Sequence, residues 1–102
     1  MANGYFERGE VYWVRVDAGY GMEQGVGRPA LIVSTNKANN ANECLNMAWL
    51  TTQEKDKAWD IVTYATGRKS WVLCNQIITV DKNRLGKILG VLPPEDMQKV
   101  DD

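Results

Sequence analysis

The sequence predicts a small, mainly β domain whose short strands form a strongly bent sheet or barrel. Runs of β-branched and aromatic residues recur along the 102-residue chain, and each run is only a few residues long. Glycine, proline and asparagine separate these runs, and little of the chain shows helical periodicity. Many short strands at close spacing favour a strongly curved sheet. The length suits a single domain over residues 1–102.

The first two strands are expected on either side of a glycine-rich loop. Residues 10–17 alternate as a strand with both faces covered, and residues 30–34 form an apolar run that Pro29 opens. Between them, residues 17–27 carry four glycines and form a connection that is long for a hairpin. Loops of that length often carry function. Residues 36–46, rich in Asn and Ala, predict a loop with at most one helical turn.

Most of the second half of the chain is also expected to be strand. Strands are predicted at residues 45–53, 58–66, 70–74, 76–80 and 87–92. Because only Asn75 separates residues 70–74 from 76–80, these two segments are either one bent strand or a tight pair. A charged loop is expected at residues 54–57, and Gly67 ends the strand before it.

Two helical segments are predicted near the C-terminus. Asp81 suits the N-cap of a short turn over residues 82–85 that Gly86 closes. Pro93-Pro94-Glu95 suits the start of a final helix, because proline is tolerated in the first turn and acidic residues are favourable there.

Composition excludes several classes of function. No apolar run approaches the roughly 18 residues of a membrane span, and the N-terminus lacks the order of a secretory signal, so we expect a cytoplasmic protein without a membrane contact. The formal net charge of −1 argues against nucleic-acid binding by bulk electrostatics. Cys44 and Cys74 are expected to be reduced thiols in the core, although a disulfide is possible by count alone.

The absence of histidine limits the chemistry that is possible. It removes Ser-His-Asp and Cys-His catalysis and the commonest transition-metal ligand. Glu54, Asp56 and Asp60 alternate with lysines rather than in a metal-binding spacing, so we expect neither a metal nor a cofactor. RNA cleavage suits the remaining polar groups, because the substrate supplies its own 2′-hydroxyl nucleophile and the protein need only align it and neutralise charge.

Arg28 and Thr51 are the first candidates for such a site. Arg28 follows the glycines, which let backbone N–H groups approach an oxyanion, and its guanidinium offers forked donors. Alternatively, Arg28 pairs with Glu23 or caps the sheet. Thr51 lies at the polar end of its strand and either offers a hydroxyl or serves only as a good strand former.

Aromatic and basic residues give weaker signals. Three of the four tryptophans are most simply core residues, and the fourth, Trp59, lies among polar residues where it suits base stacking. The three are Trp13, Trp49 and Trp71. Basic residues beside two loops either face phosphates or only keep the loops soluble, and they are Lys55, Lys57, Arg68 and Lys69.

Four segments occur in an order and at separations that are typical of one known family. They are Arg8-Gly9-Glu10-Val11-Tyr12-Trp13, Glu23-Gln24-Gly25-x-x-Arg28-Pro29, Leu50-Thr51-Thr52-Gln53 and Gln76-Ile77-Ile78-Thr79-Val80-Asp81-Lys82-x-Arg84-Leu85. With the Gly90-x-Leu92 that follows, the chain resembles the MazF/PemK-like toxins of bacterial toxin–antitoxin pairs. The resemblance covers nearly the whole chain.

The resemblance implies a small SH3-like barrel of the CcdB/PemK type, with bent antiparallel strands, short helices and a C-terminal helix. It implies a homodimeric endoribonuclease that cleaves single-stranded RNA at specific sequences without a metal. The expected products are a 2′,3′-cyclic phosphate and a 5′-hydroxyl. It further implies a MazE-like antitoxin that covers the RNA groove with an acidic segment and binds DNA together with the toxin.

Within the family pattern, Arg28 and Thr51 stand at the positions of the catalytic arginine and threonine. Glu23 stands at a loop carboxylate and is a third catalytic candidate, which either orients Arg28 or acts toward the 2′-hydroxyl. The expected substrate-binding residues are Gln24, Gly25, Gln53, Lys55, Lys57, Trp59, Asn75 and Gln76.

The chain departs from many relatives at two places. It has Asn75 and Ile78 where they carry an acid before the Gln-Ile pair and an arginine after it, which bears on base preference or on the dimer surface. Its C-terminal helix also ends early, which bears on dimer stability.

The sequence leaves two other functions open. A gyrase poison of the CcdB type acts through a tryptophan-containing C-terminal tail, whereas this chain has no tryptophan beyond Trp71. A non-catalytic RNA- or protein-binding module on an SH3-like barrel would bind RNA but leave it uncut in EDTA.

Overall fold

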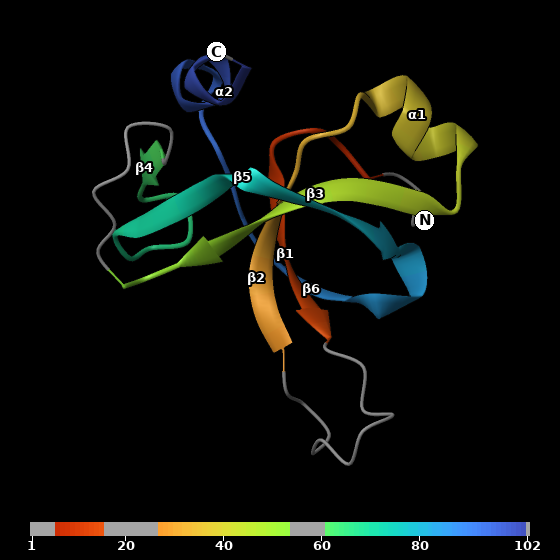
Figure 1. The fold of residues 1–102 in the computed structure, drawn as a ribbon, viewed down its shortest axis with the longest axis horizontal. Helices are drawn as coiled ribbons and strands as arrows, with labels where there is room; N and C mark the ends of the chain where they lie inside the picture. The colour runs from red at the N-terminus through yellow and green to blue at the C-terminus, as the bar shows by residue number, and fades with distance from the viewer. Residues whose placement is uncertain (1–5, 16–26, 54–60, 102) are drawn as a thin grey trace.

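The computed structural model of the chain describes residues 6–15, 27–53 and 61–101. Over these residues a single antiparallel sheet has the strand order β4-β5-β3-β2-β1-β6 and curls into a half-barrel (Figure 1). Its strands are β1 Glu10–Arg15, β2 Gly27–Ile32, β3 Cys44–Thr51, β4 Ile61–Thr63, β5 Ser70–Asp81 and β6 Leu85–Val91. The helical segments are α1 Asn36–Ala41, η1 Lys82–Arg84 and α2 Pro94–Asp101. The predicted mainly β class is confirmed.

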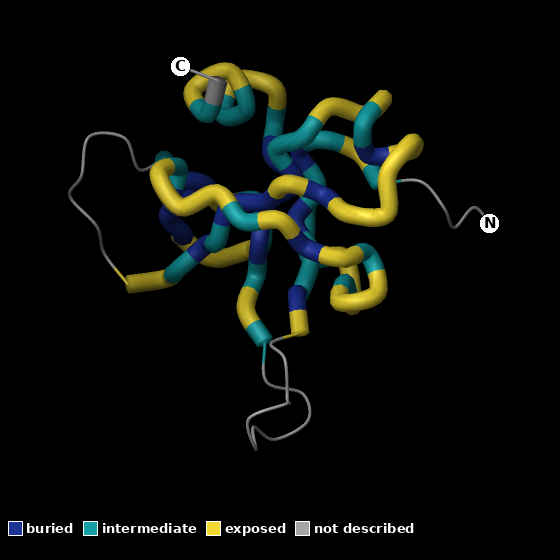
Figure 2. Tube along the Cα trace, turned by 45° about the vertical axis from the view of Figure 1, so that its right-hand side comes forward, coloured by how far each residue is buried: buried dark blue, intermediate teal, exposed yellow. Residues whose placement is uncertain are grey.

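Two clusters of buried side chains form the core on the two faces of the central strands. Figure 2 shows the buried segments, in dark blue, gathered in the middle of the molecule. Successive side chains of a strand point to opposite faces. Leu31 of β2 therefore joins one buried cluster, whereas its neighbours Ala30 and Ile32 join another. Burial on both faces explains why residues 30–33 form an unbroken apolar run instead of an alternating one.

Strand β5 is one long bent strand, which decides between the two alternatives for residues 70–80. Its pairing with β3 shifts in register between Ala48↔Ile77 and Leu50↔Val72. Residues 73–76 of β5 therefore lie opposite the single residue Trp49. Such an irregularity bends a strand and increases its twist, which helps the sheet to curl.

Several predicted boundaries are wrong for local reasons. Strand β4 covers only Ile61–Thr63 of the expected 58–66, and residues 58–60 lie outside the described part. The Thr63 hydroxyl accepts a hydrogen bond from the Ala65 backbone N–H (3.2 Å), which competes with strand pairing and turns the chain. Strand β2 begins earlier than expected, at Gly27, because residues 27–31 pair with β1.

The helical segments are close to expectation. Helix α1 has six residues, more than the single turn predicted, because Thr35 caps its N-terminus and the buried Asn39 side chain donates to the Ser34 carbonyl (3.1 Å). Asp81 caps η1 by accepting from the Asn83 N–H (2.9 Å), as predicted, although Leu85 and not Gly86 follows the turn. Helix α2 begins at Pro94.

Both cysteines are free thiols, as predicted. Cys44 is exposed at the first position of β3, so the expectation that it belongs to the core is wrong, and Cys74 is half-buried.

A hydrogen bond connects β4 to α2. The Thr63 hydroxyl of β4 donates to the Asp96 carboxylate of α2 (3.1 Å).

Gly90 of β6 is required by a close backbone approach. A Cβ atom at this position would lie 2.8 Å from the Ala65 carbonyl carbon and closer still to its oxygen. We expect Gly90→Ala to lower the free energy of unfolding by about 1–3 kcal/mol, as measured by urea denaturation.

Gly86→Ala on the same strand is the matched control. Its Cβ would meet nothing closer than the Trp13 carbonyl oxygen at 3.4 Å, so a change below about 0.5 kcal/mol is expected. Equal unfolding free energies for the two variants would contradict the prediction.

Candidate functional site

Arg28 and Thr51 come together where β2 and β3 separate. The ladder between these strands runs from Ile32↔Met47 to Ala30↔Trp49 and stops there. Two residues further along each strand, Arg28 pairs with β1 and Thr51 pairs with β5.

A pocket of about 410 Å³ is bordered by the separated strand ends. Its lining residues are Trp13, Arg28, Pro29, Leu50, Thr51, Thr52, Thr66, Arg68, Ser70 and Leu89. The two predicted catalytic residues therefore share one pocket.

The Arg28 side chain is exposed and rests on an aromatic ring. Its guanidinium carbon lies 5.1 Å from the centroid of the Trp49 ring, within the range of a cation–π interaction. The alternative partner, Glu23, lies outside the described residues.

The Thr51 hydroxyl oxygen takes part in a hydrogen bond at the end of β3. The oxygen accepts a hydrogen bond from the Gln53 backbone N–H (3.1 Å), which ends the strand in a local turn. A hydroxyl can accept and donate at the same time, so the Thr51 O–H can still donate to a phosphate oxygen.

Arg68 is a second cation of the pocket, whereas its sequence context predicts only a place in a general basic rim. It directly follows Gly67, which has a φ of +88° in the turn before β5. Arg28 likewise directly follows a glycine, so this shared pattern was the available signal. Lys69, the next residue of that rim, does not line the pocket, and its ammonium lies 5.2 Å from the Trp71 ring centroid.

Gly27 shapes the pocket by admitting Trp13. A Cβ atom on Gly27 would lie 2.6 Å from the Trp13 indole nitrogen and 2.5 Å from the Val14 carbonyl oxygen. Only glycine leaves room for the indole to pack against the start of β2, where it forms one wall of the pocket. Of the described tryptophans, Trp71 is buried, whereas Trp13 and Trp49 are half-buried, so the core interpretation holds fully only for Trp71.

The remaining predicted site residues are not gathered in the pocket. Gln53 is exposed just beyond β3, and Asn75 and Gln76 are exposed in the irregular stretch of β5. None of these three lines the pocket. The others lie outside the described residues, and they are Gln24, Gly25, Lys55, Lys57 and Trp59.

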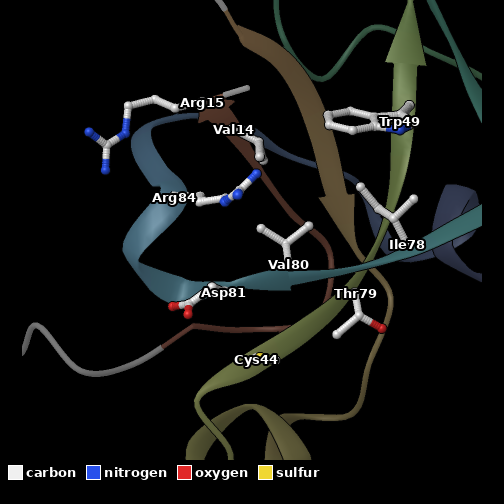
Figure 3. A pocket seen from close by; sticks show the side chains of 9 residues that line it. All are labelled: Val14, Arg15, Cys44, Trp49, Ile78, Thr79, Val80, Asp81 and Arg84. Carbon is white, nitrogen blue, oxygen red and sulfur yellow. The ribbon is translucent and has the colours of Figure 1, made fainter. Parts of the chain in front are cut away.

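A second hollow, of about 400 Å³, lies beside Trp49 (Figure 3). Its lining residues are Val14, Arg15, Cys44, Trp49, Ile78, Thr79, Val80, Asp81 and Arg84. In Figure 3 the Arg84 side chain extends toward Val14, and the Trp49 ring forms one wall above Ile78. The Arg15 guanidinium donates to the Asn83 carbonyl oxygen.

The described residues offer little acid–base or metal chemistry. No three His, Cys, Asp or Glu side chains in the described ranges come close enough to hold a metal ion. Burial and the neighbouring Glu10 carboxylate raise the pKa of Tyr12 to about 12, so this phenol stays neutral near pH 7. None of the helices described is long and apolar enough to cross a membrane.

Three comparisons with known proteins agree with one another. Residues 7–102 match the family described as PemK-like, MazF-like toxin of type II toxin-antitoxin system. The chain is 34% identical to endoribonuclease EndoA of Bacillus subtilis (strain 168), over 94% of this chain and 88% of that protein. It is 30% identical to endoribonuclease MazF of Staphylococcus saprophyticus, over 93% of this chain and 84% of that protein.

A solved structure is similar over the same length. It is an endoribonuclease in complex with its cognate antitoxin from Mycobacterial species, with a TM-score of 0.78 and 29% identity. The match covers 94% of this chain and 87% of that chain.

Proposed function

Because the chain belongs to the PemK-like, MazF-like toxins of type II toxin–antitoxin systems, we propose that it cuts single-stranded RNA at the pocket of Arg28 and Thr51. The family is the one that the sequence predicted. The relatives named above are endoribonucleases, which favours cleavage over a gyrase poison or a non-catalytic binding module. The observation that carries the site assignment is that Arg28 and Thr51 border one pocket where their strands separate.

The proposed reaction is an intramolecular displacement on the RNA. The 2′-hydroxyl gives up its proton to a base, Glu23 or water, as its oxygen bonds to the adjacent phosphorus. The bond from phosphorus to the 5′-oxygen breaks and that oxygen takes up a proton, which leaves a 2′,3′-cyclic phosphate and a 5′-hydroxyl. The Arg28 guanidinium neutralises the charge that builds on the phosphoryl oxygens, and the Thr51 hydroxyl donates to one of them.

Proton transfer is the part that Arg28 is least suited to perform. A guanidinium stays protonated near neutral pH, so we assign Arg28 an electrostatic role and not that of a general acid. Glu23 remains a proposed third catalytic residue, either to orient Arg28 or to act toward the 2′-hydroxyl. We assign the recognition of the RNA bases to the exposed side chains of Gln53, Asn75 and Gln76 and to the candidates that lie outside the described residues.

The proposed partner is an antitoxin with an acidic, extended segment. Arg28 and Arg68 both line the pocket, and carboxylates placed there would mimic RNA phosphates and exclude the substrate. A similar endoribonuclease has been solved in complex with its cognate antitoxin. We place the toxin in the cytoplasm, where its RNA substrate is found.

The first test is cleavage of a long RNA in the presence of EDTA. We expect cleavage to continue in EDTA, because no step of the proposed reaction uses a metal. The cuts should fall at a short, defined sequence. Sequencing and enzymatic mapping of the ends should find a 2′,3′-cyclic phosphate and a 5′-hydroxyl.

Variants at the site provide the controls. Arg28→Ala and Thr51→Ala should each lower the cleavage rate by about 10²–10³-fold while circular dichroism shows a folded protein. Lys87→Ala, an exposed lysine of β6 that does not line the pocket, should cut like the wild type. Full activity in both site variants would contradict the assignment of Arg28 and Thr51 to the catalytic site.

Arg68 should contribute to RNA binding through its charge. In a Thr51→Ala background, where RNA is consumed slowly enough for a binding measurement, Arg68→Ala should raise the Kd for single-stranded RNA by roughly tenfold. The slope of log K against log salt should fall in magnitude by about 0.7, the value for one phosphate contact to a single strand.

Lys69→Ala is the matched control, since its charge lies over Trp71 and outside the pocket. If Arg68→Ala and Lys69→Ala behave alike in fluorescence anisotropy titrations, Arg68 has no specific role.

A homodimer is also part of the proposal. Ile77, Ile88 and Val91 are 50%, 43% and 58% exposed in the single chain, which is apolar area that a second copy would cover. Light scattering after size-exclusion chromatography should give twice the 11.5 kDa of one chain. A monomer at every concentration up to about 100 μM, well above typical dimer affinities, would argue against it.

A further inference from the structure

Trp49 lies between the core and the proposed catalytic arginine. It stands two residues before Thr51 on β3, so both side chains project from the same face of the sheet. Ala30 is its partner on β2, and Arg28, two residues before Ala30, projects from that face too. The geometry brings the Arg28 guanidinium to 5.1 Å from the Trp49 ring centroid.

The Trp49 ring is fixed by its other neighbours. It is half-buried and packs against the cluster that contains Val14, Ala30 and Val80. Figure 3 shows the ring above Ile78 at the wall of the second hollow, and Ile78 packs against the same cluster. A side chain held by the core on one side thus offers a fixed surface to the site on the other.

Arg28 has little else to hold it within the described part of the chain. Its side chain is exposed, and among the described residues it makes no hydrogen bond or ion pair. A free arginine samples many rotamers, and fixing it costs conformational entropy. Of the aromatic side chains, tryptophan is the best partner for a cation over its face, and a planar guanidinium can also stack on it.

We propose that Trp49 is a positioning residue, which holds the Arg28 guanidinium in place beside Thr51 before RNA binds. The inference rests on the proposed function, because it assigns Trp49 a role in the same site. Trp49 acts through Arg28 and needs no contact with the RNA. An exposed cation–π contact favours the held arrangement by about two- to fivefold, which sets the size of the expected effect.

The kinetic test compares Trp49→Phe, which keeps a ring, with Trp49→Leu, which keeps only apolar volume. We expect Trp49→Leu to lower kcat for a short RNA by about two- to fivefold with KM unchanged, and Trp49→Phe to recover most of that loss. Phe6→Leu is the matched control, because Phe6 packs against the same cluster and its ring lies 5.5 Å from the Lys82 ammonium, a different cation. It should leave kcat unchanged.

A spectroscopic test needs no reaction, and its first readout uses the wild-type ring of Trp49. Protons held above an indole face are shifted upfield in NMR spectra, so the Arg28 Nε–H signal of the wild-type protein, assigned by its loss in Arg28→Lys, should be shifted upfield. In Trp49→Leu it should move to the position of an unstructured arginine.

The outcomes separate the proposed role of Trp49 from the proposed function. An unshifted Arg28 signal in the wild-type protein overturns the proposal even if Trp49→Leu fails to fold. A folded Trp49→Leu with wild-type kcat, or a Trp49→Phe as impaired as Trp49→Leu, overturns it as well. A wild-type protein that cuts no RNA but shows the shifted signal overturns the proposed function and leaves the contact between Trp49 and Arg28 established.

Discussion

The brief pairing of β2 with β3 is the constraint on which the rest of the structure depends. Three residue pairs join these strands, and both faces of the paired segment are buried. Beyond Ala30 and Trp49 each strand pairs only with its outer neighbour, so the two strand ends move apart. The gap places one polar residue from each strand, Arg28 and Thr51, at the border of a pocket. A longer ladder would have closed this pocket with backbone hydrogen bonds.

An irregularity in the pairing of β3 with β5 contributes to the curl of the sheet. Residues 73–76 of β5 oppose Trp49 alone, and a strand with extra residues must bend. Strand β5 has buried residues in its first part, which belongs to the core, and exposed residues, Asn75 and Gln76, in its middle. The same residue, Trp49, thus marks where β2 leaves β3 and where β5 departs from a regular ladder.

Stability and the proposed activity share side chains in this small domain. Trp49 packs against a buried cluster and carries the Arg28 guanidinium on its ring. Trp13 packs over Gly27 and also walls the pocket. A domain of 102 residues has limited buried surface, so residues that border its site also contribute to its core. Changes near the site are therefore best judged with a folding measurement beside the activity measurement.

The sequence by itself determined the β class, the family and the chemistry that is excluded. Strand runs and turn residues act locally, and the absence of histidine is a fact of composition, so both can be known before the fold. Arg28 and Thr51 became catalytic candidates because each lies in one of the segments that carry the family resemblance. Only the tertiary structure decided that Arg68 joins the pocket and that Trp49 holds Arg28. Those contacts depend on strand register and on an irregularity between β3 and β5, and register is a property of residues far apart in the chain.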